Sequence, residues 1–272
     1  MPETIVGVTV PDSEKARDAG ALPSLLIVPG AWHKPDHFRR LVDEFSGIDV
    51  HTVTLTSTGD DPATLGNMYA DAEVIAQAAA AIDGPVVVVA HSYGGVPTTQ
   101  GLASARNVRR IVYLCAFQLD AGESLLSPNG GSLMPWAKLH HRDGFDDYVE
   151  AMSPTTVFYN DVDMLTARRA VAQLGYQSYA SMRQPLTKTA WRTIPSTYVI
   201  CDADNAIPVA TQERIARRAD DVQRLSTSHS PFLSQPAALA RLIRRSLATA
   251  QRDENHRAGE ADSSQLCSRR AT

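Results

Sequence analysis

The feature that most constrains the fold is an apolar run that leads directly into a turn with one serine and two glycines. Residues 86–90 read VVVVA, residues 91–95 read HSYGG, and a helical pattern follows over 93–105. A run that is apolar on both faces is typical of a central parallel strand covered by helices. Glycines after Ser92 would let the strand turn sharply into the helix and leave the serine hydroxyl exposed above the sheet. The pattern therefore predicts a nucleophilic serine at Ser92.

The competing interpretation of Ser92 is an ordinary N-cap at the start of a helix. Ala90 also stands where the usual Gly-x-Ser-x-Gly pattern has its first glycine. Alanine is the next smallest side chain, so the turn could still close. The preceding strand, the following Gly94-Gly95 pair and the helix together favour the catalytic interpretation.

Strand-like and helical patterns alternate along most of the chain. Strands are predicted at 24–28, 50–55, 86–90, 108–114, 196–201 and 222–225, and helices at 35–45, 67–82, 93–105, 209–218 and 236–249. Such alternation favours an α/β fold with a mostly parallel central sheet flanked by helices, because each crossover must return across the sheet.

The alternation stops after residue 117 and resumes near residue 194. Glycine and proline clusters and helical patterns fill this interval, which is too long for an unstructured loop and predicts an inserted helical cap at about 118–193. We therefore expect one domain over 22–250, with its core at 22–117 and 194–250. Residues 1–21 form an N-terminal arm, and the polar residues 251–272 are expected to be disordered.

A serine nucleophile needs a base and an acid, and hydrolases built on such a sheet place them in the order serine, acid, histidine. Of eight histidines, His229 lies between the last short strand and the last helix, where a loop can bring it over Ser92. Asp204 and Asp202 both follow the strand at 196–201. Asp204 is favoured as the acid that would orient the imidazole, with Asp202 as the alternative.

An oxyanion hole needs two N–H groups directed at the developing negative charge. The backbone N–H of Tyr93, directly after the nucleophile, supplies one. Ala31, in the turn after the first strand, supplies the other, because Gly30 lets that turn bend. Taken alone, this turn would be read as an ordinary strand end.

Composition limits the other function classes. The chain has 272 residues, 26 Lys and Arg against 30 Asp and Glu, and a net charge of −4, without the basic face of a nucleic-acid binder. It shows no membrane span or secretory signal. We therefore expect a cytoplasmic location and no membrane partner. Cys115, Cys201 and Cys267 are too widely spaced for a metal cluster, and neither a metal nor a cofactor is predicted. The sequence leaves a homodimer open.

Several longer motifs resemble those of a known family. PGAWH at 29–33, AHSYGG at 90–95, AWRTIPSTYVICDADNAIP at 190–208 and SHSPFLSQP at 228–236 are similar to the α/β-hydrolase superfamily. The similarity is to the branch that includes plant methylesterases, polyneuridine aldehyde esterase and hydroxynitrile lyases, and it covers about residues 24–249. It implies the α/β-hydrolase fold, with Ser92, Asp204 and His229 as catalytic residues and Ala31 and Tyr93 as oxyanion donors.

The resemblance also suggests the reaction. The lyases have Thr where this chain has Gly30 and Lys where it has Ser230, which argues for hydrolysis of a carboxylic ester through an acyl-enzyme. A hydrophobic or aromatic small molecule is the expected substrate, with Trp32, Trp136, Phe158 and Tyr159 as its contacts. A methyl ester, a lactone and a thioester are equally open. Two alternatives stay open: a tailoring enzyme such as a C–C bond hydrolase, cyclase or lyase, and a ligand-binding receptor on the same fold.

Overall fold

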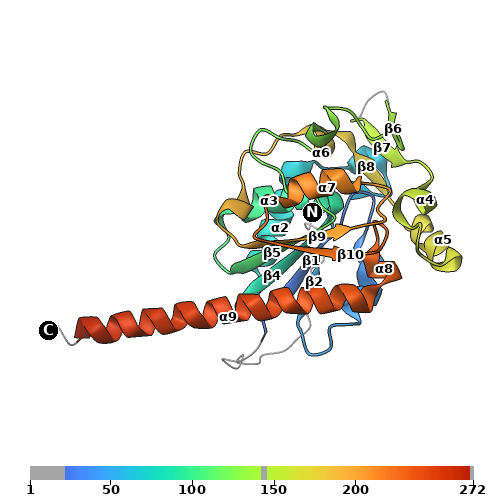
Figure 1. Cartoon of the computed structure of the whole chain (residues 1–272). Helices are drawn as coiled ribbons and strands as arrows, with labels where there is room; N and C mark the ends of the chain where they lie inside the picture. Colours follow the sequence, from blue (N-terminus) through green and yellow to red (C-terminus); the bar gives the residue numbers. More distant parts are fainter. Residues whose placement is uncertain (1–21, 142–145, 270–272) are drawn as a thin grey trace, which may run out of the picture.

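The computed structural model describes residues 22–141 and 146–269, and it is built around one parallel sheet (Figure 1). The predicted N-terminal arm at 1–21 lies outside the described residues. The sheet order is β10-β9-β5-β4-β1-β2, and every neighbouring pair is parallel. The strands are β1 (Ser24–Val28), β2 (Val50–Thr52), β4 (Val86–His91), β5 (Val108–Leu114), β9 (Ser196–Cys201) and β10 (Asp221–Leu225). The six predicted strands are thus confirmed.

Helices cover both faces of this sheet, as its apolar central strands require. Every residue of β1 and β4 is buried. In Figure 1, α9 runs along one side of the sheet, and α2, α3 and α7 lie on the other. The helices of the core are η1 (Pro35–Phe38), α1 (Arg39–Val42), η2 (Pro62–Thr64), α2 (Met68–Ala80), η3 (Ser92–Gly94), α3 (Gly95–Gly101), η4 (Leu102–Ser104), α7 (Val209–Ala216), α8 (Pro231–Ser234) and α9 (Pro236–Arg269).

The cap region, residues 118–193, differs from the helical insertion that the sequence predicts. It contains three strands, β6 (Ala137–His140), β7 (Tyr148–Ala151) and β8 (Tyr176–Ser178), which pair antiparallel with one another. The two-residue strand β3 (Thr58–Gly59) extends this sheet from the core, in the order β3-β8-β7-β6. The prediction of a helical cap therefore missed these strands.

Helices are nevertheless present in the cap region, and they are short. They are η5 (Ser127–Asn129), α4 (Pro154–Phe158), α5 (Met164–Ala172), α6 (Tyr179–Arg183) and η6 (Ala190–Arg192). The strands between them were missed because each has only three or four residues. Alternation over so short a span is not distinguishable from a loop, and pairing with distant segments decides the conformation.

The C-terminal segment also differs from the prediction. Helix α9 continues to Arg269, through the residues expected to be disordered, and its end projects beyond the sheet in Figure 1. Arg109, in β5, forms a bidentate ion pair with Glu254. Arg110 Nη2 lies 3.6 Å from Asp253 Oδ2. These pairs connect the polar part of α9 to the core, which apolar content alone does not reveal. Within the described residues, no helix is long and apolar enough to cross a membrane.

Helices α2 and α3 pack very closely at Gly101, the last residue of α3. A Cβ atom at Gly101 would lie 3.0 Å from the Ala72 carbonyl carbon and closer still to its oxygen, which is backbone and cannot move aside. Gly101 has an ordinary helical φ of −76°. The glycine is therefore needed for space and not for backbone conformation.

This packing gives opposite expectations for Gly101→Ala. Helix propensity alone predicts that alanine stabilises the protein by up to about 1 kcal/mol. We expect instead that the clash with Ala72 lowers the free energy of unfolding by about 1–3 kcal/mol, as overpacking does. Urea unfolding followed by circular dichroism measures the change. Gly122→Ala is the matched control, because Gly122 has φ +84° but open space around its Cβ, so its cost is backbone strain alone. A stabilised Gly101→Ala protein would contradict the packing.

Candidate active site

Ser92 occupies the turn between β4 and α3, in a strained backbone conformation. Its φ is +52°, in the left-handed region that residues with a side chain rarely adopt. Neighbouring chains approach this turn closely. A Cβ at Gly94 would overlap the Pro29 carbonyl oxygen, and one at Gly95 would lie 2.8 Å from the Phe117 carbonyl oxygen. Small residues after Ser92 are thus required by space, as the sequence pattern indicates.

His229 and Asp204 form a buried hydrogen-bonded pair. His229 Nδ1 lies 2.7 Å from Asp204 Oδ2, and the two side chains are 2% and 0% exposed. The other carboxylate oxygen, Oδ1, accepts the backbone N–H groups of Ala206 (2.7 Å) and Ile207 (2.9 Å). Gln212 Nε2 donates to Oδ2 at 3.0 Å. Both Asp204 oxygens therefore accept from these donors, and in this arrangement His229 directs an Nδ1 proton at Oδ2 and carries no proton on Nε2.

The structure also separates the two candidate acids. Asp202 is exposed and binds Arg224, whose Nη2 and Nε lie 2.5 Å and 2.9 Å from the Asp202 Oδ1. Asp202 thus takes part in a surface ion pair, whereas Asp204 contacts the imidazole. The geometry favours Asp204, as the sequence does.

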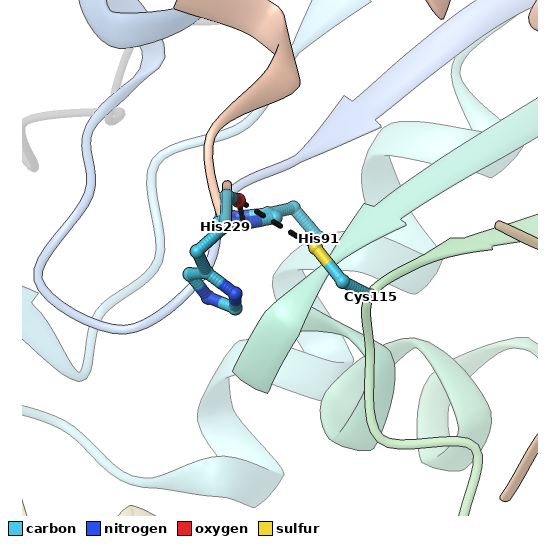
Figure 2. Close-up of side chains that lie close together, drawn as sticks. All are labelled: His91, Cys115 and His229. Atoms are coloured by element: carbon cyan, nitrogen blue, oxygen red, sulfur yellow. Dashed lines mark hydrogen bonds between the residues drawn. The ribbon is translucent and has the colours of Figure 1, made fainter. Parts of the chain in front are cut away.

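Two further side chains hold the main chain of His229. His91 Nε2 lies 2.9 Å from the His229 carbonyl oxygen, and Cys115 Sγ lies 3.5 Å from it. Figure 2 shows both side chains meeting this carbonyl. Since a carbonyl only accepts, the contact fixes the tautomer of His91 with its proton on Nε2. Burial lowers the pKa of His91 well below its usual value and raises that of the Cys115 thiol, so both groups are neutral.

These three residues also bring potential metal ligands within 4.8 Å of one another. The Nε2 of His91 and the Sγ of Cys115 are directed at a carbonyl, however, and the His229 ring is paired with Asp204. The contacts that the structure shows therefore serve to position His229.

The loop at residues 29–33, here called the oxyanion loop, is fixed by side chains at both ends of one peptide group. His33 Nδ1 donates to the Ala31 carbonyl at 2.8 Å, and Gln177 Oε1 accepts the Trp32 N–H at 3.2 Å. His33 Nε2 in turn accepts the Tyr159 hydroxyl at 3.0 Å. Trp32 has φ +63°, so this loop is strained as well. Within the described residues, the Ala31 N–H makes no hydrogen bond to the protein.

Two further histidines, His33 in this loop and His37 just after it, are also held neutral by burial. Burial lowers the pKa of His33 well below its usual value, and the neighbouring His37 lowers it further. Burial also lowers the pKa of His37, whose Nε2 donates to the Ala170 carbonyl at 3.0 Å. The rings of His37, His33, His91 and His229 follow one another at centroid distances of 4.9, 5.3 and 4.6 Å. Neutral neighbours avoid repulsion in this row.

Tyr93, the other predicted oxyanion donor, is fixed through its side chain. Its hydroxyl donates to Asp71 Oδ2 at 2.7 Å. Asp71 is completely buried and also accepts Thr56 Oγ1 (2.8 Å), the Ser57 N–H (3.0 Å) and Ser57 Oγ (2.5 Å). Burial raises the pKa of Asp71, and these hydrogen bonds oppose the shift. Burial and the Asp71 carboxylate raise the pKa of Tyr93 well above its usual value, so the phenol stays protonated.

A largely apolar cavity opens over Ser92, with an empty volume of about 690 Å³ counted to its mouth. Its walls come from the oxyanion loop, the Asp204 loop and the cap region. None of the described lining residues is charged. They include Ala31, Trp32, Ser92, Phe117, Leu126, Leu133, Met134, Trp136, Met182 and Ile207, with Asn129, Ser132 and Thr211 as polar members.

Two of the four predicted substrate contacts line this cavity, and the other two do not. Trp32 and Trp136 line it, and their rings lie 5.6 Å apart. Phe158 and Tyr159 do not line it, contrary to the prediction. Phe158 is buried against the rings of Trp32 (5.7 Å) and His229 (5.7 Å), and Tyr159 binds His33. These residues were predicted from their hydrophobic character. That character does not separate side chains that line the cavity from side chains that pack behind its wall.

Sequence analysis missed three polar residues of the site. His91 received no role, although its place directly before the nucleophile was a usable signal. Asp71 lies on an amphipathic helix and Gln177 in a strand that was not predicted, so neither carried a local signal.

Comparison with known proteins agrees with this fold. Residues 25–242 match the model of the alpha/beta hydrolase family. A curated protein called alpha/beta hydrolase nvfD, from Aspergillus novofumigatus, is 30% identical over 239 residues, which is 82% of this chain and 95% of the relative.

Solved structures show the same fold at lower identity. A pyrethroid hydrolase from Sphingobium faniae superimposes with a TM-score of 0.70 at 20% identity, over 82% of this chain and 96% of that one. Polyneuridine aldehyde esterase gives a TM-score of 0.70 at 18% identity, over 81% and 98%. The parallel sheet, the strained serine turn and the family match lead to one conclusion: the chain belongs to the alpha/beta hydrolase family.

Proposed function

We propose that this protein is a carboxylic ester hydrolase that acts on neutral, apolar esters through an acyl-enzyme at Ser92. The observation that carries the proposal is the buried pair of Asp204 and His229, 2.7 Å apart, in a protein whose Ser92 sits at a strained turn on the cavity floor. The pyrethroid hydrolase and the esterase with the same fold are consistent with it.

The first half of the reaction forms the acyl-enzyme. His229 Nε2 accepts the Ser92 hydroxyl proton while the Ser92 oxygen attacks the ester carbonyl carbon. Asp204 stabilises the imidazolium that forms, because its carboxylate already receives the Nδ1 proton in a hydrogen bond. The imidazolium then gives its proton to the leaving alcohol. In the second half, His229 accepts a proton from water while the water oxygen attacks the acyl carbon. The imidazolium then returns that proton to the departing Ser92 oxygen, which releases the carboxylic acid.

The negative oxygen of each tetrahedral intermediate would be held by the Ala31 and Tyr93 N–H groups. The Tyr93 N–H lies at the start of a helical turn, where backbone donors lack intrahelical partners. Preorganised donors of this kind stabilise developing charge without reorganisation.

The cavity supports the substrate class. Its walls are mostly aliphatic and aromatic, and no described lining residue would pair with a charged substrate group. Burying an unpaired charge there is costly, so a neutral ester with an apolar acyl or alcohol group is favoured. A screen of p-nitrophenyl esters of increasing acyl length, read with mass spectrometry of co-purified ligands, would narrow this class.

The assignment of the nucleophile predicts the behaviour of Ser92→Ala. We expect ester turnover to fall by about 10³-fold or more, because the covalent step is removed. Labelling by a fluorophosphonate probe should be lost, while thermal unfolding shows an intact fold. Ser132→Ala is the matched control, since Ser132 also lines the cavity and should leave labelling unchanged. Labelling retained in Ser92→Ala would refute the assignment, and tight ligand binding without turnover in the wild type would favour a receptor.

The two aspartates give a second contrast. In Asp204→Asn the amide would meet both the Gln212 Nε2 donor and His229 Nδ1, which favours the wrong histidine tautomer. We expect kcat to fall by roughly 10³–10⁴-fold, the range seen when a triad carboxylate is replaced by an amide. Asp202→Asn breaks the surface pair with Arg224 and should change kcat by less than about threefold. Equal losses in the two variants, with intact circular dichroism spectra, would show that Asp204 is not the acid.

The neutral histidines predict how stability depends on pH. His33, His37 and His91 have folded-state pKa values below the ordinary value of about 6.5, so below pH 6.5 the unfolded state binds more protons. Stability should therefore be constant above about pH 6.5 and fall as the pH drops from there toward the lowered pKa values. The slope is at most about 1.4 kcal/mol per pH unit for each histidine. Urea unfolding at pH 7.5, 6.5 and 5.5 measures it.

His37→Gln serves as the test variant for this pH dependence. Glutamine can still donate to the Ala170 carbonyl but does not titrate, so the slope should become shallower by about one histidine's share. The variant also isolates the histidine contribution from that of Asp71, whose raised pKa acts in the opposite direction. The explanation fails if the wild type and His37→Gln lose stability in parallel.

A further inference from the structure

A buried polar network connects the cap region to both sides of the serine turn. Its centre is Gln177, in β8, which is completely buried. Its Nε2 donates to Ser57 Oγ (2.8 Å) and Ser181 Oγ (2.8 Å), and its Oε1 accepts Thr58 Oγ1 (2.6 Å) and the Trp32 N–H (3.2 Å). All four hydrogen-bonding positions of the amide are therefore occupied.

The orientation of this amide follows from its neighbours. Ser57 Oγ donates to Asp71 and Ser181 Oγ donates to the Ser178 carbonyl, so each hydroxyl can only accept from Gln177. The amide nitrogen must face these two hydroxyls, and the amide oxygen must then face the Trp32 N–H. A buried network with every member satisfied is rigid, because any rotation leaves a polar group unpaired.

One arm of the network reaches the oxyanion loop. Gln177 accepts the N–H of the peptide between Ala31 and Trp32, and His33 donates to the carbonyl of that same peptide. A peptide held from both sides cannot rotate. The preceding peptide, which carries the Ala31 N–H, is itself held at its carbonyl, because Gly30 accepts the His33 N–H at 3.2 Å.

The other arm reaches the second donor. Gln177 contacts Ser57, Ser57 donates to Asp71, and Asp71 accepts the Tyr93 hydroxyl. The Tyr93 ring is therefore anchored at its far end, and its backbone N–H lies at the strained turn. Neither Gln177 nor Asp71 is among the residues that line the cavity.

We infer that Gln177 and Asp71 are positioning residues that set the distance and direction of the two oxyanion-hole N–H groups relative to each other. This inference rests on the proposed ester hydrolysis. Misplacing a catalytic group by about 1 Å can cost 10²-fold in rate, so the network acts on kcat although it does not touch substrate.

The test compares Gln177→Met with Thr58→Val in p-nitrophenyl ester hydrolysis. Methionine fills the same volume but cannot accept the Trp32 N–H. Thr58→Val removes a different donor from the same amide oxygen and keeps that contact. We expect kcat to fall by about 10–100-fold in Gln177→Met with KM changed by less than about threefold, and by less than threefold in Thr58→Val. Thermal unfolding shows how far each variant is destabilised.

A trifluoromethyl ketone supplies a readout that a purely structural role would not move. Its adduct with Ser92 carries an oxyanion, whereas the corresponding methyl ketone binds without one. The affinity for the trifluoromethyl ketone should fall in Gln177→Met by the same factor as kcat. The affinity for the methyl ketone should stay within about threefold of the wild-type value. Tyr93→Phe, which removes the hydroxyl from Asp71 but keeps the backbone N–H, should show the same pattern and carries the test if Gln177→Met does not fold.

The outcomes separate the two hypotheses. If the wild type is neither labelled by a fluorophosphonate nor active on esters, the proposed function fails. If the wild type is labelled and active but Gln177→Met, or Tyr93→Phe in its place, keeps the kcat of Thr58→Val, the positioning role is overturned. Parallel loss of trifluoromethyl ketone and methyl ketone affinity would likewise overturn it, because the network would then shape the cavity as a whole.

Discussion

The whole site depends on the sharp turn in which Ser92 follows the central strand β4. The turn places Ser92 at φ +52°, and the oxyanion loop and the chain after β5 press against it at Pro29 and Phe117. Backbone strain of this kind costs about 1–3 kcal/mol and persists only where surrounding structure over-determines it. Here the fully buried strands β1 and β4 supply that constraint. Helix α3 then starts from the turn and leaves the Tyr93 N–H without an intrahelical partner.

The imidazoles around the turn follow a single rule, which is that each directs one ring nitrogen at an oxygen that can only accept. Backbone carbonyls fix the tautomers of His33 and His91, and the Asp204 carboxylate fixes that of His229. Because burial keeps His33 and His91 neutral, no charged histidine lies beside His229 in this row. Within the row of His37, His33, His91 and His229, only His229 contacts a carboxylate, that of Asp204.

Sequence analysis predicted the parts of the fold whose signals are local. The central strands of the sheet are visible as apolar runs, and the candidates Ser92, Asp204 and His229 follow from strand ends and chain order. The cap strands could not be predicted in this way, because β8 has three residues and pairs with β3, more than a hundred positions earlier in the chain. Gln177 and Asp71 share this difficulty. Their importance comes from partners brought together by the tertiary structure, and a glutamine or a helical aspartate has no spacing that reveals it. Phe158 illustrates the reverse case, since its aromatic character was read correctly and its position behind the cavity wall was not.

Trp32 links the chemistry to the cap region. Its ring lines the cavity, its backbone N–H binds Gln177 in β8, and its Nε1 donates to the Val149 carbonyl in β7 at 2.7 Å. Displacing β7 or β8 would break these bonds and disturb the oxyanion loop. The segment 125–136 behaves differently, because it lines the same cavity through side chains such as Leu126 and Leu133 and, within the described residues, makes no hydrogen bond to residues 29–33. The two parts of the cap region thus contact the oxyanion loop in different ways. Strands β7 and β8 are hydrogen-bonded to the oxyanion loop through Trp32, whereas the 125–136 segment contacts this loop by packing, as Trp136 does on Trp32.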